Sequence, residues 1–151
     1  MALYITLSNH NSVALIALLL ICRFDMHSVS KGKIGELAIR KNLIEADYNI
    51  YLPECDSAQV DLVVELESGM MKRVQIKSVY GSRNGTAIEV NTRKYVNTGR
   101  VDVIAVYYDE MIAYVPYENQ KSLQLAISTA KNGQTKDRNW FYSYKRFPEY
   151  S

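Results

Sequence analysis

Residues 60–79 read VDLVVELESGMMKRVQIKSV and contain two segments in which apolar and polar residues alternate. The first segment, residues 60–67, has an apolar residue at every even position, and residues 71–79 continue the alternation after a break. A period of two is that of a β-strand with one buried face. Ser68-Gly69, which separates the two segments, is typical of a tight turn. The stretch therefore predicts an antiparallel hairpin.

Pairing across this hairpin brings three polar side chains to one face of the sheet. A three-residue loop at residues 68–70 sets Asp61 opposite Lys77, whereas a register shifted by two sets Asp61 opposite Gln75. All three share a face in both registers, with opposite pairs about 5 Å apart and diagonal pairs about 7 to 8 Å apart. A carboxylate, an amide and an ammonium group thus gather at one place, and the carboxylate of Glu36 is expected to pack over them.

Two helices are predicted on either side of the hairpin in the sequence. The first covers residues 31–46 after Ser30 as its N-cap, with one apolar stripe at Ile34, Leu37, Ala38 and Leu43 or Ile44. The second is predicted from the helical spacing of Leu123, Ala126, Ile127 and Ala130, ahead of Asn132 and Gly133.

Further strands are predicted at residues 48–52, 101–108 and 111–115. Residues 101–108 are almost continuously apolar, which favours a buried, central strand. Residues 80–100 are basic, hold three glycines and are too polar for a core. We therefore expect an α/β fold in which helices flank a central sheet.

The composition fits one cytoplasmic globular domain. The chain has 151 residues, of which 48% are hydrophobic, and its sixteen aromatic residues exclude a disordered chain. Only two cysteines, Cys22 and Cys55, are present, too few for a disulfide framework or a zinc cage. This cysteine usage is typical of a reducing compartment.

The first 25 residues differ from the rest of the chain. Residues 13–22 are an unbroken apolar run, too short to span a bilayer and without the basic segment of a signal peptide. We expect residues 1–25 to be an apolar N-terminal extension outside the core, and residues 26–151 to be the working domain, with no membrane partner. The alternative is an additional core helix.

Charges are strongly segregated along the chain although its net charge is only +2. Residues 42–71 contain seven acids and no Lys or Arg, and residues 72–100 contain seven basic residues and only Glu89 as an acid. An acidic cluster beside a basic segment suits a divalent metal site next to a polyanion better than a membrane surface. Two solvated faces of opposite charge are the alternative.

The hairpin residues resemble the active-site motif of the PD-(D/E)XK nuclease superfamily. Asp61 begins one strand and, after a gap of thirteen residues, Gln75-Ile76-Lys77 follows on the next. The resemblance extends from about Ser30 to Pro116 and implies a restriction-endonuclease-like core with a mixed sheet. Val60 stands where this family has proline, and Gln75 stands where it has an acid.

The resemblance also implies a role for each of these residues. Asp61, the backbone carbonyl of Ile76, Gln75 and Glu36 would hold a divalent cation, Mg²⁺ or alternatively Mn²⁺. Lys77 would orient the attacking water and stabilise the transition state of phosphodiester hydrolysis. A literal Pro53-Glu54 pair precedes the hairpin and is interpreted as a turn.

A narrower resemblance links residues 31–36, KGKIGE, and the QxK variant to homing endonucleases encoded by cyanobacterial tRNA group I introns. It implies a sequence-specific double-strand break at a long, pseudo-palindromic DNA site, which starts intron homing. Symmetric cleavage calls for a homodimer or homotetramer, and the aromatic residues of the segment 140–150 favour an oligomer interface. The candidates for DNA contact are Lys31, Lys33, Arg83, Arg93, Lys94 and Arg100.

Two other classes of function remain open at this point. The first is a Holliday junction resolvase or a restriction-type nuclease of the same superfamily, and a junction enzyme needs fewer base-reading side chains. The second is a non-catalytic DNA-binding module whose acidic face is only structural.

The expected domain boundary is testable by truncation. A chain that starts at Met26 is expected to fold and to cut DNA, because the apolar extension is not needed for the core. Circular dichroism and a cleavage assay on both chains check this. Aggregation of the shorter chain alone would place the extension in the core.

Overall fold

The computed structural model describes residues 28–55, 59–130, 133 and 135–149. The expected extension, residues 1–25, lies outside the described residues. No helix in these ranges is long and apolar enough to cross a membrane.

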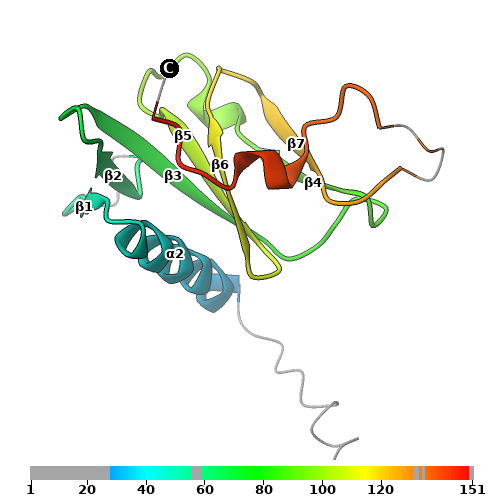
Figure 1. The fold of residues 1–151 in the computed structure, drawn as a ribbon, viewed down its shortest axis with the longest axis horizontal. Coiled ribbons are helices and arrows are strands. Elements are labelled where there is room, and N and C mark those ends of the chain that lie inside the picture. The colour runs from blue at the N-terminus through cyan, green and yellow to red at the C-terminus, as the bar shows by residue number, and fades with distance from the viewer. Residues whose placement is uncertain (1–27, 56–58, 131–132, 134, 150–151) are drawn as a thin grey trace, which may run out of the picture.

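A five-stranded mixed sheet forms the centre of the fold (Figure 1). Its strands, in spatial order, are β1 (Asn49–Tyr51), β2 (Leu62–Glu65), β3 (Met71–Val79), β5 (Val103–Tyr108) and β6 (Met111–Pro116). β3 and β5 are parallel, and the other neighbours are antiparallel. The mixed central sheet is thus confirmed, and the apolar strand β5 lies inside it, as its sequence predicts.

The β2–β3 hairpin adopts the second of the two expected registers. Leu62 pairs with Val74 and Glu65 with Met71, a register that sets Asp61 opposite Gln75. The register based on a three-residue loop is wrong because the turn is longer. The Leu66 N–H donates to the Met70 carbonyl at 2.9 Å, and this closes the turn around a Gly69 with φ of +78°.

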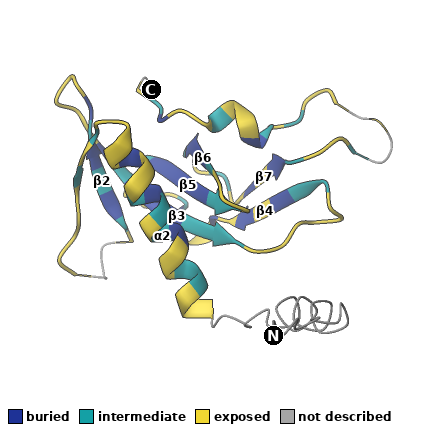
Figure 2. Cartoon of the chain, turned by 60° about the horizontal axis from the view of Figure 1, so that its bottom comes forward, coloured by how far each residue is buried: buried dark blue, intermediate teal, exposed yellow. Residues whose placement is uncertain are grey.

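Helix α2 (Ser28–Glu45) covers one face of the sheet, where it packs on β3 and β5. Its buried residues are Gly35, Ile39 and Leu43, so of the predicted apolar stripe only Leu43 is buried and Ala38 is half-buried. Ile34, Leu37 and Ile44 are exposed, and Figure 2 shows exposed residues along the side of α2 that faces away from the sheet.

The close approach of α2 to the sheet explains this rotation of the stripe. A Cβ atom on Gly35 would lie 1.9 Å from Ser78 Oγ and 3.2 Å from Tyr107 Cβ. Only a residue without a side chain allows this contact, and it turns the line Gly35–Ile39–Leu43 toward the core. Pattern reasoning that counts apolar side chains overlooks a glycine at the point of closest packing. Ser30 lies inside the helix and is not its N-cap.

The other face of the sheet carries strands rather than a second helix. β4 (Ala87–Asn91) pairs with β7 (Ser122–Ala126) in a two-stranded antiparallel sheet. The predicted helix from Leu123 to Ala130 is therefore wrong. Leu123 and Leu125 are buried while Gln124 is exposed. This alternation has the period of two of a β-strand and not the spacing of a helix.

Residues 80–100, expected to be too polar for a core, contribute to one. Ile88 and Val90 of β4 and Tyr95 of the 3₁₀ turn η2 (Arg93–Tyr95) pack with β5 and β6 in a second hydrophobic core. The polar residues of this segment alternate with the buried ones, so the mean polarity of the segment does not indicate the strand that it contains.

The aromatic C-terminal segment supports both cores. Phe141, in η3 (Phe141–Tyr144), belongs to the second core, and Phe147 packs with Tyr114 and Ile39 in the first. Tyr142 is exposed, so part of this segment remains at the surface.

Two glycines of α2 provide a matched test of the helix–sheet contact. Gly35→Ala is expected to lower the free energy of unfolding by about 1–3 kcal/mol, because its Cβ overpacks Ser78 and Tyr107. Gly32→Ala meets nothing within 4 Å and is expected to raise it by about 0.5–1 kcal/mol through helix propensity. Urea unfolding of both variants checks the opposite signs. An equal gain in both would show that α2 is not tightly packed at Gly35.

Candidate active site

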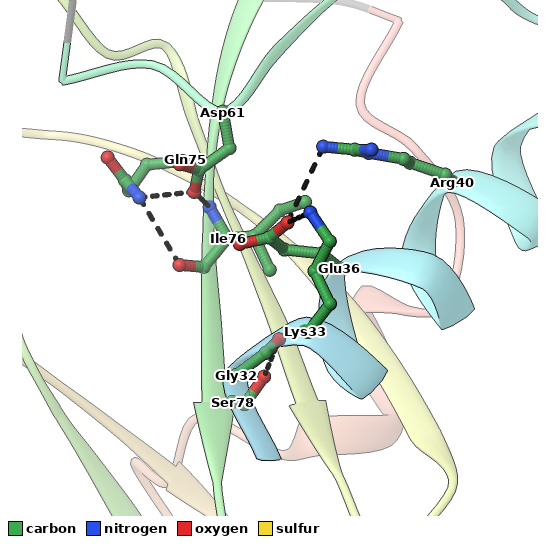
Figure 3. Close-up of polar contacts among 8 residues, drawn as sticks. All are labelled: Gly32, Lys33, Glu36, Arg40, Asp61, Gln75, Ile76 and Ser78. Atoms are coloured by element: carbon green, nitrogen blue, oxygen red, sulfur yellow. Dashed lines mark hydrogen bonds and ion pairs between the residues drawn. The ribbon is translucent and has the colours of Figure 1, made fainter. Parts of the chain in front are cut away.

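Asp61 lies just before β2 and is bound to β3 through both its backbone and its side chain. Its N–H donates to the Val74 carbonyl at 2.9 Å. Its carboxylate oxygen Oδ2 accepts the Ile76 N–H at 2.6 Å and a hydrogen bond from Gln75 Nε2 (Figure 3). The hairpin therefore fixes the direction of this carboxylate.

The Gln75 amide connects two oxygens that the resemblance assigns to a cation. Nε2 donates to Asp61 Oδ2 and also to the Ile76 carbonyl at 3.3 Å. Gln75 itself is buried. One N–H donor group thus bridges a carboxylate and a carbonyl oxygen at a single point, and the amide can turn its own oxygen there instead. Oxygen donors of this kind suit a hard divalent cation, so the residues present fit the expected metal.

Glu36 adds negative charge to the site and forms ion pairs with two basic residues of its own helix. Its carboxylate pairs with Lys33 Nζ at 2.9 Å and Arg40 Nη2 at 3.5 Å (Figure 3). In the described ranges, no three Asp, Glu, His or Cys side chains gather closely enough to hold a metal. The hairpin thus brings together one carboxylate, a carbonyl and an amide. Glu36, the second carboxylate expected to pack over their face, belongs to α2, which packs on the opposite face of the sheet with Val74 and Ile76, and it acts on Asp61 by its charge.

Burial makes the charged form of Asp61 unfavourable. Desolvation raises the pKa of Asp61, and the negative charge of Glu36 raises it further. The Ile76 N–H and the positive charges of Lys77 and Lys94 act in the opposite direction. Burial prevails and the pKa lies above its ordinary value, so a cation bound here would relieve an electrostatic cost.

Lys77 follows on the same face of β3. Its ammonium group lies 5.2 Å from the centre of the Tyr95 ring. Burial lowers the pKa of Lys77 and the nearby charge of Lys94 lowers it further, against the opposing effect of Asp61. The structure thus brings Asp61, Gln75 and Lys77 together as the hairpin predicts.

The candidates for DNA contact are spread over several elements. Lys31 lies over the Tyr80 ring, at 5.5 Å from its centre, whereas Lys33 pairs with Glu36 and Arg83 pairs with Glu89 at 3.2 Å. Arg93, Lys94 and Arg100 are exposed. Of the six, only Lys94 reaches the hairpin site by its charge, on Asp61 and Lys77.

Tyr95 is the residue of the site that sequence reasoning missed. It is fully buried, follows the four polar residues 91–94 in the sequence, and contacts Lys77 only because of how the chain runs between β4 and β5. No local pattern signals this contact, since it depends on tertiary packing.

Two hollows of about 590 and 660 Å³ lie away from these residues. They are lined by the end of α2, the β2–β3 turn and the C-terminal segment. Neither hollow is lined by Asp61, Gln75 or Lys77, so the candidate site is defined by its polar contacts and not by a hollow.

The family model described as PD-(D/E)XK endonuclease matches residues 26–147. The chain belongs to this family. Its fold resembles the structure of a bacterial homing endonuclease, I-Ssp6803I, with a TM-score of 0.60 and 20% identity over 79% of this chain and 86% of that one. At that identity the likeness shows the fold alone, which is restriction-endonuclease-like as predicted. No curated protein matches the chain.

The pKa of Asp61 in this endonuclease gives a pH-dependent stability. Its pKa is raised on folding, so between the ordinary and the raised value the folded state binds more protons and the free energy of unfolding falls as pH rises. In Asp61→Asn this fall is absent. The stability of the wild type relative to this variant, measured by urea unfolding in EDTA, is therefore expected to decrease from acidic to neutral pH.

Asp47→Asn is the matched control. Asp47 is exposed and has a φ of +61°, which asparagine also tolerates. A wild-type stability that increases with pH relative to Asp61→Asn would mean that the hydrogen bonds to the carboxylate outweigh its burial.

Proposed function

We propose that this chain is a metal-dependent, sequence-specific DNA endonuclease that makes double-strand breaks by phosphodiester hydrolysis and starts intron homing. The observation that carries the proposal is the convergence of Asp61 Oδ2, the Ile76 carbonyl and the Gln75 amide on one point, with Lys77 on the same face. Membership of the PD-(D/E)XK endonuclease family supports the reaction class.

Phosphodiester hydrolysis builds negative charge next to a group that is already charged. Bound Mg²⁺, or Mn²⁺ in its place, would supply a Lewis acid for that charge and an activated water. Asp61, the Ile76 carbonyl and the oxygen of Gln75 would hold it. Lys77, whose ammonium group stands on the same face, would orient the water and stabilise the charge that develops on the phosphate.

Glu36 would act as a further carboxylate of the site. Gln75 carries no charge where the family has an acid, so the negative charge that attracts a cation comes from Asp61 and Glu36. Lys33 and Arg40 bind Glu36 in the free protein. A cation or a DNA phosphate near α2 would compete with these two ion pairs.

The partner would be double-stranded DNA, and a homodimer or homotetramer would cut its two strands. One structural neighbour is a bacterial homing endonuclease, which supports DNA as the substrate, and the resemblance to this class implies a long, pseudo-palindromic site. Contact with DNA would come from Lys31, Lys33, Arg83, Arg93, Lys94 and Arg100, with the lysines on phosphates and the arginines on guanine edges. The enzyme would act in the cytoplasm.

Cleavage of plasmid DNA tests the function. With Mg²⁺, the wild type is expected to convert a plasmid that carries an intronless tRNA gene into a single linear product. Asp61→Ala and Lys77→Ala are expected to slow this at least about 100-fold, because each removes a group that acts on the transition state. EDTA is expected to abolish it. Gel electrophoresis of a time course measures the rates.

Lys41→Ala is the control, since Lys41 pairs with Glu45 at 2.9 Å on the exposed side of α2. No cleavage by the wild type, with tight binding to four-way junctions, would instead favour a junction resolvase. Binding of duplex DNA that neither variant changes, without cleavage under any condition, would leave a DNA-binding module.

A further inference from the structure

The turn η2 places two residues, Lys94 and Tyr95, against the same face of β3 as the candidate site. It belongs to the connection that leads from β4 to β5, and its last residue, Tyr95, is fully buried. The Tyr95 ring meets the Tyr117 ring edge-on, with centres 6.3 Å apart. A residue of an exposed connection is thus built into the core beside Lys77.

Hydrogen bonds hold this turn in one position. The buried Thr92 donates its hydroxyl to the Gln120 carbonyl and its N–H to the Lys121 carbonyl at 3.1 Å. The Tyr95 N–H donates to the Thr92 carbonyl at 2.9 Å, and the Thr98 hydroxyl donates to the Tyr95 carbonyl at 2.8 Å. Lys94 is therefore presented from a fixed backbone, as a side chain with a chemical role requires.

Two ammonium groups share the Tyr95 ring. Lys77 Nζ lies 5.2 Å and Lys94 Nζ 4.9 Å from its centre. Both distances are within the range of cation–π attraction, which strengthens when the cation is desolvated. The negative charge of Asp61 also acts on the Tyr95 hydroxyl and on Lys94. Four side chains from two distant segments thus form one electrostatic cluster.

Lys94 differs from Lys33 and Arg83, two other candidates for DNA contact, in its ion pairs. Lys33 and Arg83 each have a carboxylate within 3.2 Å, whereas in the described ranges no carboxylate pairs with Lys94. Its side chain is exposed while its backbone is fixed. Two like charges held on one ring repel each other until an anion joins them, and a phosphodiester with growing negative charge is such an anion.

We propose that Lys94 is a second active-site lysine that contacts the scissile phosphate, and that Tyr95 is a positioning residue whose ring holds Lys94 and Lys77 in place. The proposal rests on the proposed function. It assigns Lys94 to the reacting phosphate rather than to the general DNA-binding surface.

The ring, and not the hydroxyl, is the part of Tyr95 that acts. In the described part of the chain the buried hydroxyl has no hydrogen-bond partner. An unpaired buried hydroxyl destabilises the folded state, so phenylalanine is expected to fit here without loss of stability. Tyr95→Phe keeps the ring and Tyr95→Leu removes it, and the two variants separate the contributions.

Single-turnover cleavage with full-length enzyme in excess over DNA tests the role of Lys94. Lys94→Ala is expected to lower the cleavage rate about 10- to 100-fold while Kd for the same DNA in Ca²⁺ changes less than about 5-fold. Lys94→Arg, which keeps the charge, is expected to recover most of the rate. Arg93→Ala, which removes the neighbouring charge, is expected to raise Kd. A Lys94→Ala variant that changes Kd alone would make Lys94 an ordinary DNA contact.

The ring is tested in the same assay. Tyr95→Phe is expected to cleave within about 3-fold of the wild type and to be at least as stable, whereas Tyr95→Leu is expected to lose at least about 10-fold in rate. Leu125→Ala, in the same core, controls for lost stability and is expected to cut normally below its unfolding temperature. Equal loss in both Tyr95 variants would assign the effect to the hydroxyl and overturn the positioning role.

A combined variant separates positioning from a structural effect. If Tyr95 acts through Lys94, the losses in Lys94→Ala and Tyr95→Leu are expected to be less than additive in the double variant. Additive losses would show that Tyr95 does not act through Lys94. In every arm Lys77→Ala reports on the proposed function. Its inactivity beside an unaffected Lys94→Ala would leave the endonuclease standing and refute the second lysine alone.

Discussion

The hydrogen bond from the Ile76 N–H to the Asp61 carboxylate links the fold to the site. β2 begins at Leu62, opposite Val74 of β3, and in the described part of the chain no strand pairs with this edge of β3 beyond that point to accept its backbone donors. The side chain of Asp61 takes that place at 2.6 Å. The same contact fixes the carboxylate, keeps it half-buried and brings it to the Gln75 amide. Local pairing, burial and the direction of the charged group therefore depend on one interaction.

The parts of the structure that follow from a period of two could be predicted from the sequence. Asp61, Gln75 and Lys77 share a face whichever register the hairpin takes, so an error in the turn length did not affect the site. The strand β5 is apolar throughout and lies inside the sheet, as such a pattern predicts.

The predictions that the structure contradicts concern features that tertiary contacts determine. The buried side of α2 is set by Gly35, which has no side chain for an apolar pattern to count. In β7, Leu123 and Ala126 have the spacing of a helix whereas Leu123 and Leu125 have that of a strand, and only pairing with β4 decides between the two. Tyr95 reaches the site from another element, and no local spacing encodes that contact.

The parallel pairing of β3 and β5 has a consequence for the order in which the enzyme becomes active. The two strands are neighbours in space, but the chain must first build β4 and η2 before β5 can dock beside β3. Such long-range closure is slow compared with hairpin formation. On the ribosome the β2–β3 hairpin emerges early, yet Lys77 acquires its aromatic platform only after the crossover is complete. A partly synthesised chain therefore carries the motif residues without the assembled site. The site is complete only once β5 has docked beside β3.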